Sequence, residues 1–120
     1  MSRDHRRLRV FVLADELVRS TYDATKRFPD GERFGLQSQL RRSAVSAATN
    51  IVEGSARQST RAYLSFLNIA SASATEARYL VELSHRLGLL DSETTADLVG
   101  GYTALVAGLQ ALIRALSNRP

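Results

Sequence analysis

Cysteine is absent from the sequence, which excludes disulfide bonds and metal sites built on thiolates. A chain of 120 residues still buries roughly 65% of its unfolded surface on folding, so a core can form without a cross-link. The lack of cysteine suits a reducing compartment, and we expect a cytoplasmic protein. The length predicts a single domain over residues 1–120.

Long apolar runs are absent as well. An apolar stretch follows the basic N-terminus, but Asp15 and Glu16 interrupt it before it reaches the length of a signal-peptide core. No uninterrupted run of about 20 apolar residues occurs elsewhere, as a transmembrane helix would require. We therefore expect no signal peptide and no membrane partner.

Histidine is scarce, and the residues that build catalytic or metal sites form no recognisable set. His5 and His85 are the only histidines, and neither lies in a setting typical of a Ser–His–Asp triad. Glu82 and His85 form an E-x-x-H step of the kind used by di-iron bundles, but those bundles need the step twice and two further inward glutamates. No glycine-rich phosphate loop is present. We expect no catalytic residue, no metal and no cofactor, and hence a protein that is not an enzyme.

Lysine is nearly absent, because 15 of the 16 basic residues are arginine, and the net charge is +4. Arginine binds phosphates and carboxylates through paired hydrogen bonds, so a basic balance permits nucleic-acid binding. The alternative is an ordinary soluble surface, which the modest charge, spread along the chain, favours. One cluster is the candidate contact for RNA or DNA: Arg3, Arg6, Arg7 and Arg9. In the competing view, Asp4, Asp15 and Glu16 offset this cluster locally.

The sequence does contain four amphipathic helical patterns and no convincing strand. Apolar residues recur at steps of three and four, which predicts helices over residues 8–28, 36–54, 60–87 and 92–117. Residues that end or begin helices stand at the boundaries of these ranges: Pro29, Gly54, Ser59, Thr60, Gly88 and Asp91. Gly100, Gly101 and Gly108 weaken the last pattern and are expected to let a neighbouring helix approach closely. Short connections make successive helices antiparallel neighbours, so we expect an all-α, up-down-up-down four-helix bundle.

The helix over residues 36–54 carries a polar stripe roughly 120° from its apolar face. The stripe consists of Gln39, Arg42, Ser46, Asn50 and Glu53. If the next turn centres near residue 57, antiparallel pairing puts Glu53 near Arg61, Ser46 near Asn68, and Arg42 within a turn of Glu76. Such partners would satisfy buried polar groups, and we favour a lock between helices that fixes their register. The alternative is that the stripe lines a site.

A third side of the same helix is apolar. Val45 and Val52 lie on it, with Ala48 leading towards it. Apolar residues away from the core suggest a second interface, and these three are candidates for contact between subunits. The alternative is that they are isolated surface residues, which are common in soluble proteins.

The polar stripe also carries a resemblance. The stretch "QLRRSAVSAATNIVEGSAR" resembles the second-helix signature of the 23S rRNA intervening-sequence proteins, Q-x-x-R-x-x-x-S-x-x-x-N-I-x-E-G-x-x-R. The matching residues are Gln39, Arg42, Ser46, Asn50, Ile51, Glu53, Gly54 and Arg57. The preceding loop fits through Phe28, Pro29, Glu32 and Leu36, and the third helix through Phe66, Leu67, Ile69, Ala70, Ser73, Glu76 and Leu87. The resemblance covers roughly residues 8 to 117.

There are departures from the family pattern. Ala47 and Ala48 stand where the family usually has Ile-Pro, and Ser71 and Ala72 where it often has Arg-Gly. The missing proline should leave the second helix straighter, and the missing arginine removes any role of charge at that position.

The resemblance implies a four-helix bundle that commonly assembles as a ring-like homopentamer. Some members are encoded inside insertions in ribosomal RNA genes, and related bundles are accessory proteins of reverse transcriptases in diversity-generating retroelements. No member is recognised as an enzyme. We therefore predict a non-catalytic oligomeric scaffold that binds RNA or DNA through arginines. The alternative is a protein-interaction module, for example for a reverse transcriptase, without direct nucleic-acid contact.

Overall fold

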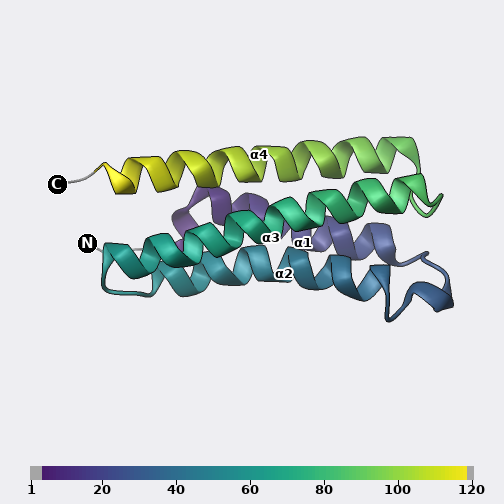
Figure 1. Ribbon diagram of the computed structural model, residues 1–120, viewed down its shortest axis with the longest axis horizontal. Helices are drawn as coiled ribbons and strands as arrows, with labels where there is room; N and C mark the ends of the chain where they lie inside the picture. The colour runs from purple at the N-terminus through teal and green to yellow at the C-terminus, as the bar shows by residue number, and fades with distance from the viewer. Residues whose placement is uncertain (1–3, 119–120) are drawn as a thin grey trace.

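Four long helices make up most of the chain in the computed structural model, which describes residues 4–118 (Figure 1). Within those residues there is no strand. The helices are joined by short connections, and two single-turn 3₁₀ helices flank α1. In chain order the elements are η1 (His5–Arg7), α1 (Arg9–Thr25), η2 (Asp30–Glu32), α2 (Leu36–Ser55), α3 (Thr60–Arg86) and α4 (Ser92–Ser117).

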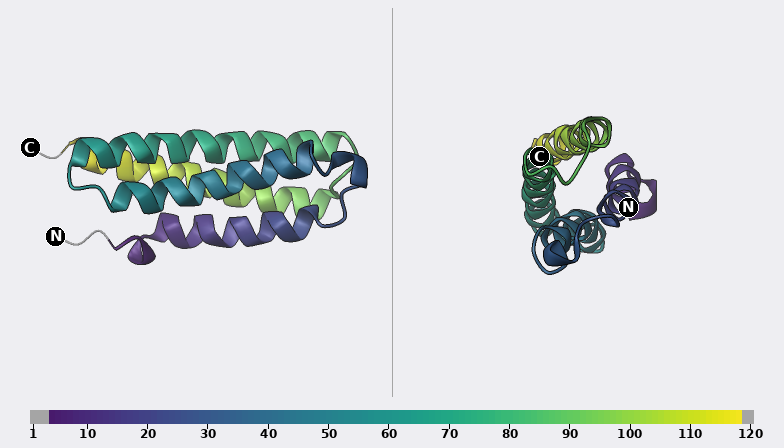
Figure 2. Two further views of the ribbon diagram at one scale, coloured as in Figure 1. Left: turned by 90° about the horizontal axis from the view of Figure 1, so that it is seen from below. Right: turned by 90° about the vertical axis from the view of Figure 1, so that its right-hand side faces the viewer.

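The helices run alternately up and down and form a four-sided bundle, as Figure 2 shows from the side and from one end. Each helix packs on two neighbours, because α1 contacts α2 and α4, and α3 contacts the same two helices. Within residues 4–118 the backbones of the diagonal pairs stay farther apart, because no Cα atom of one lies within 8 Å of a Cα atom of the other. The predicted all-α, up-down-up-down bundle is therefore confirmed. Its centre is filled by fully buried side chains, the largest of which are Tyr102, Leu40, Ile51, Leu67, Leu105 and Leu109.

The first helix ends at Thr25, three residues before the predicted end at residue 28. In a continuing helix the carbonyl oxygen of Thr25 would accept from the amide of residue 29, but residue 29 is proline and has no N–H. The side-chain amide of Gln37 donates to that oxygen instead, at 2.8 Å. Phe28, the last residue of the predicted helix, lies in the turn that follows α1 and is buried there.

The predicted helix starts and one of the predicted stops are confirmed. Ser59 caps α3 by accepting from the amide of Ala62, and Asp91 caps α4 by accepting from the amide of Thr94. The Thr94 amide also holds the pKa of the Asp91 carboxyl below its usual value. Gly88, two residues after the end of α3, adopts φ +79°, a backbone conformation that favours glycine. The prediction for Gly54 was wrong, because this residue lies buried inside α2 and the helix continues to Ser55.

The fourth helix is the most apolar of the set. By length and composition alone, Ser92–Ser117 could cross a membrane, with a mean hydropathy of 1.4 over its most apolar window. One face of α4 packs against α1 and α3 through Leu98, Leu105 and Leu109. Only 22% of that window is buried, however, and no charged residue stands between positions 98 and 113. The outer face of α4 is consequently uncharged between these positions, and the exposed charges of Asp97 and Arg114 lie on either side of them.

Candidate functional site

Every neighbouring pair of helices is joined by a side-chain hydrogen bond. The bond between α2 and α3 joins the hydroxyls of Ser46 and Ser73, and it uses a residue of the predicted stripe. The other three junctions were missed from the sequence, since they involve residues outside that stripe. They are Gln37 and Arg41 on Thr25 (α1–α2), Gln110 on Ser71 (α3–α4), and Thr21 with Tyr102 (α1–α4).

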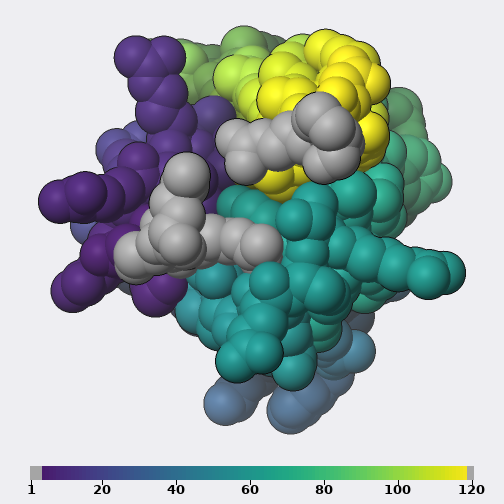
Figure 3. Space-filling view, turned by 90° about the vertical axis from the view of Figure 1, so that its left-hand side faces the viewer, coloured from purple at the N-terminus to yellow at the C-terminus, as the bar shows by residue number. Residues whose placement is uncertain are grey.

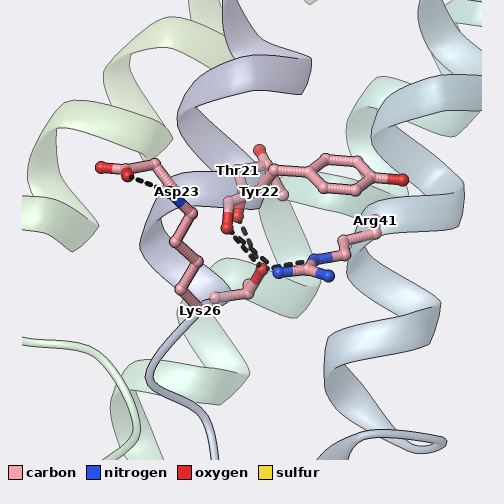
Figure 4. A network of polar contacts seen from close by, with 6 residues as sticks. Thr21, Tyr22, Asp23, Lys26 and Arg41 are labelled. Carbon is pink, nitrogen blue, oxygen red and sulfur yellow. Dashed lines mark hydrogen bonds and ion pairs between the residues drawn. The ribbon is translucent and has the colours of Figure 1, made fainter.

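The α1–α2 junction is a polar network at the C-terminal end of α1 (Figure 4). Arg41 donates through Nε to the hydroxyl of Thr25 at 2.8 Å and through Nη2 to the carbonyl of Tyr22 at 3.1 Å. Its guanidinium carbon also lies 4.5 Å from the centre of the Tyr22 ring. A helix leaves its last carbonyls without amide partners and carries partial negative charge there, so a cation from α2 stabilises this end. The network therefore caps the C-terminal end of α1.

The α1–α4 junction is buried completely. The hydroxyls of Thr21 and Tyr102 are hydrogen-bonded 2.5 Å apart, and both residues are fully inaccessible to solvent. Burial raises the pKa of Tyr102 to about 12 because the phenolate would lose its hydration, while the bond to Thr21 acts in the opposite direction. This buried hydrogen bond fixes the position of α1 along the bundle axis relative to α4.

The predicted polar stripe borders a shallow hollow between α2 and α3. The hollow has a volume of about 210 Å³ and is lined by Gln39, Arg42, Ser43, Ser46, Ser73 and Glu76. At its floor Ser46 meets Ser73 at 2.9 Å, and the side-chain amide of Asn50 donates to the carbonyl and the hydroxyl of Ser46. Arg42 and Glu76, expected within a turn of each other, line the same hollow.

The other predicted pairings differ from the structure. Ser46 bonds to Ser73 and not to Asn68, whose amide donates to the carbonyl of Leu64 within its own helix. Glu53 and Arg61 are both exposed, and among residues 4–118 no ion pair joins them. The assumed register is off by about one helical turn, because the connection of residues 56–59 carries the chain beyond the end of α2 before α3 begins (Figure 1). The role of the outer stripe residues as a lock stays a prediction.

The apolar side of α2 is partly covered. Ala48 packs against the core, Val52 is half-buried, and Val45 is 38% exposed. On α1, Val12 is 47% exposed. The bonds of Gln37 and Arg41 to Thr25 set the antiparallel register of α1 and α2, which brings Val12 roughly level with Val52. The three residues Val12, Val45 and Val52 are called the α1–α2 apolar strip below.

The N-terminal arginines differ in their surroundings. Arg3 lies outside the described residues. Arg6 is paired with Asp4, its Nη2 lying 2.9 Å from the carboxylate, and this hydrogen bond lowers the pKa of Asp4 to about 2. Arg7 and Arg9 are exposed, and within residues 4–118 no carboxylate pairs with either of them.

Two residues of catalytic type, His85 and Ser92, lie within hydrogen-bond distance of each other and line a hollow of about 320 Å³ together with Glu82. His5 packs edge-on against the ring of Phe11, and His85 lies 3.3 Å from the hydroxyl of Ser92. No group of three or more His, Asp or Glu that could hold a metal occurs in the described part of the chain. Another hollow, about 640 Å³ between the end of α1 and the start of α4, mixes acidic and basic side chains, among them Asp23, Lys26, Arg27, Asp91 and Asp97.

The geometry defines the class of the protein as an antiparallel, all-α four-helix bundle with polar bonds at each helix junction. Comparison with known families agrees: the chain belongs to the family described as 23S rRNA-intervening sequence protein, whose sequence model matches residues 6–111. The resemblance read from the second helix is thereby confirmed.

A solved structure is similar over nearly the whole chain. It is a protein of unknown function from the S23 ribosomal protein family of Bacteroides thetaiotaomicron VPI-5482, determined at 1.70 Å resolution. The two share 25% sequence identity with a TM-score of 0.81, and the match covers 88% of this chain and 95% of that one. Among curated proteins, none matches the sequence significantly.

Proposed function

We propose that this protein is a non-catalytic, cytoplasmic scaffold that binds RNA or DNA through arginines and acts as a homo-oligomer. The observation that carries nucleic-acid binding is the exposure of Arg7 and Arg9 at the start of α1 without a carboxylate partner in the described chain. An unpaired guanidinium is free to bind a phosphate through two hydrogen bonds. In a ring of five subunits, five such pairs would act together, and weak contacts would sum to a useful affinity.

The first test is a gel-shift titration with RNA and DNA of equal length. We expect binding at about 50 mM salt and release by a few hundred millimolar, because phosphate contacts release counterions. The Arg7→Gln/Arg9→Gln variant should bind about 10- to 100-fold more weakly at low salt. The matched control is Arg19→Gln/Arg33→Gln, which loses the same charge elsewhere and should bind like the parent. Failure of the parent to shift either nucleic acid at low salt would contradict the proposal.

Self-association is supported by two surfaces. The α1–α2 apolar strip exposes branched side chains, and the outer face of α4 carries no charge between positions 98 and 113. A closed ring requires two different surfaces of one subunit to meet, and these two lie on different sides of the bundle. Both would be removed from water by a neighbour, which is the favourable term in association.

A charge on the α1–α2 apolar strip should weaken assembly. We expect Val45→Glu to raise the dissociation constant of the oligomer about 100-fold, since an unpaired carboxylate buried at an interface costs on the order of 3 kcal/mol. Light scattering at micromolar concentration measures the change. Ala72→Glu, an exposed site on α3, is the control and should leave the assembly intact. A parent protein that is monomeric would refute the oligomer.

The alternative function is a protein-interaction module, for example for a reverse transcriptase. It is favoured by Phe34, whose side chain is 88% exposed on the connection between α1 and α2. Exposed aromatic residues are frequent anchors of protein interfaces. The gel-shift titration separates the two functions, because this module would show no salt-dependent retention on nucleic acid.

A further inference from the structure

Arginines that are far apart in the sequence gather at one end of the bundle. This end holds both termini, the connection between α2 and α3, and the last turns of α4, and Figure 3 looks directly onto it. Its arginines come from three separate segments: Arg6, Arg7, Arg9, Arg57, Arg61 and Arg114. Only two carboxylates, Asp4 and Glu53, belong to the same described segments.

The charge is consequently polarised along the bundle. Among the remaining described residues, eight basic side chains are outnumbered by ten acidic ones, so the positive charge of the molecule is concentrated at the end with the termini. In the sequence the charge looks evenly distributed, because the same arginines are spread from position 6 to position 114. We call this surface the arginine end.

Four of the six arginines have no internal partner that explains their position. Within residues 4–118, Arg7, Arg9, Arg61 and Arg114 pair with no carboxylate, whereas Arg6 is bound to Asp4 and Arg57 lies over the ring of Phe66. Arg9 and Arg61 also stand in the first turns of α1 and α3. The partial positive charge of a helix N-terminus disfavours a cation there, so neither residue is placed for the stability of its helix.

We propose that the whole arginine end, and not the N-terminal arginines alone, binds the phosphodiester backbone of a nucleic acid. The inference rests on the proposed function and extends its surface to Arg61 and Arg114. The bundle is 22 by 19 Å across its shorter axes, so arginines on α1, α3 and α4 lie far enough apart to reach several phosphates at once. Guanidinium groups without carboxylate partners suit phosphates, and contacts to phosphates carry little sequence preference.

The number of free arginines sets the expected salt dependence. Each phosphate contact adds about −0.9 to the slope of log affinity against log salt on duplex DNA. Four contacts for each subunit predict a slope of roughly −3 to −4 at the level of one chain. Loss of two contacts should reduce the magnitude of that slope by about 2 and lower the affinity about tenfold or more for each arginine at 50 mM salt.

The test compares two double variants of the full chain with equal loss of charge. Arg61→Gln/Arg114→Gln alters the arginine end, and Arg33→Gln/Arg86→Gln alters exposed arginines near the opposite end. Fluorescence anisotropy follows the binding of a labelled duplex DNA, a duplex RNA and a polyglutamate peptide over a range of salt. We expect the first variant to show the weaker affinity and shallower slope on both nucleic acids, and the second to match the parent. Thermal melts establish that both variants are folded.

Each other outcome is decisive. If the parent binds nucleic acid and both variants bind it with the same affinity as the parent, the extension to the arginine end is overturned while the proposed function stands. Equal weakening of both variants would mean that net charge alone governs binding, which also overturns the extension. Polyglutamate binding as tight as nucleic-acid binding would refute phosphate as the ligand. No binding by the parent to either nucleic acid removes the proposed function and the extension together.

Discussion

Replacing Gly54 by alanine should lower the free energy of unfolding by about 1–3 kcal/mol, although alanine is the better helix former. A Cβ atom at this position would lie 2.8 Å from the Cβ of Phe66 and 3.1 Å from a ring carbon of Tyr63. The first of these distances is shorter than real carbon contacts, and the Cβ of Phe66 is fixed to its backbone. The added methyl group therefore has to push α3 away from α2.

The matched control is Gly100→Ala on α4. Nothing lies within 4 Å of a Cβ built at Gly100, so only the gain in helix propensity remains. We expect this variant to be more stable by up to about 1 kcal/mol. Chemical denaturation at equilibrium measures both changes, and the opposite signs are the diagnostic result. A Gly54→Ala protein as stable as Gly100→Ala would show that α2 and α3 do not approach closely at this point.

The second large effect is a loss of stability at alkaline pH that depends on Tyr102. Burial raises the pKa of its phenol to about 12 in the folded protein. Below about pH 10, the ordinary value, the phenol is protonated in both states and the stabilisation is complete. Between pH 10 and 12 the unfolded chain releases this proton and the folded chain does not. The free energy of unfolding should therefore fall by about 3 kcal/mol across that window.

Tyr102→Phe should abolish this contribution. At neutral pH the variant is expected to be less stable by about 1 kcal/mol, because Thr21 loses its buried partner. From pH 9 to pH 11 the parent should lose about 1.4 kcal/mol more than the variant, which reverses or cancels the difference between them. Denaturant titrations at the two pH values measure the effect. Tyr79→Phe, which removes an exposed phenol, is the control and should follow the parent; parallel pH profiles of parent and Tyr102→Phe would contradict the prediction.

The proposed nucleic-acid surface combines arginines that lie far apart in the sequence. Arg3, Arg6, Arg7 and Arg9 were recognisable as a cluster because they lie within seven residues of the chain. Arg61 and Arg114 were not, since their proximity to that cluster depends on α1 and α3 starting, and α4 ending, at the same end of the bundle. The net charge follows from the sequence alone. The electrostatic surface also depends on which segments the turns of the chain bring to the same end of the bundle.

Local pattern alone determined the helical architecture. Apolar steps of three and four residues, the caps at Ser59 and Asp91 and the turn at Gly88 are properties of neighbouring residues, and they define four helices of nearly correct length. The second-helix signature was equally legible, because its residues recur at helical spacing and need no tertiary contact to be recognised. The family assignment followed from that signature and holds over residues 6–111.

Only the tertiary structure decided how the helices lock together. Helical periodicity does not tell how far one helix is shifted along its axis relative to its neighbour. That shift decides three contacts: Ser46 with Ser73, Thr21 with Tyr102, and Arg41 with the end of α1. A one-turn shift keeps the same faces inward and leaves the pattern unchanged. Close packing favours one of these axial shifts, because the missing side chain of Gly54 leaves room for Phe66 of α3 at that position. A larger residue at position 54 would exclude Phe66. The sequence thus determined which faces are buried, and packing between whole helices determined which residues meet.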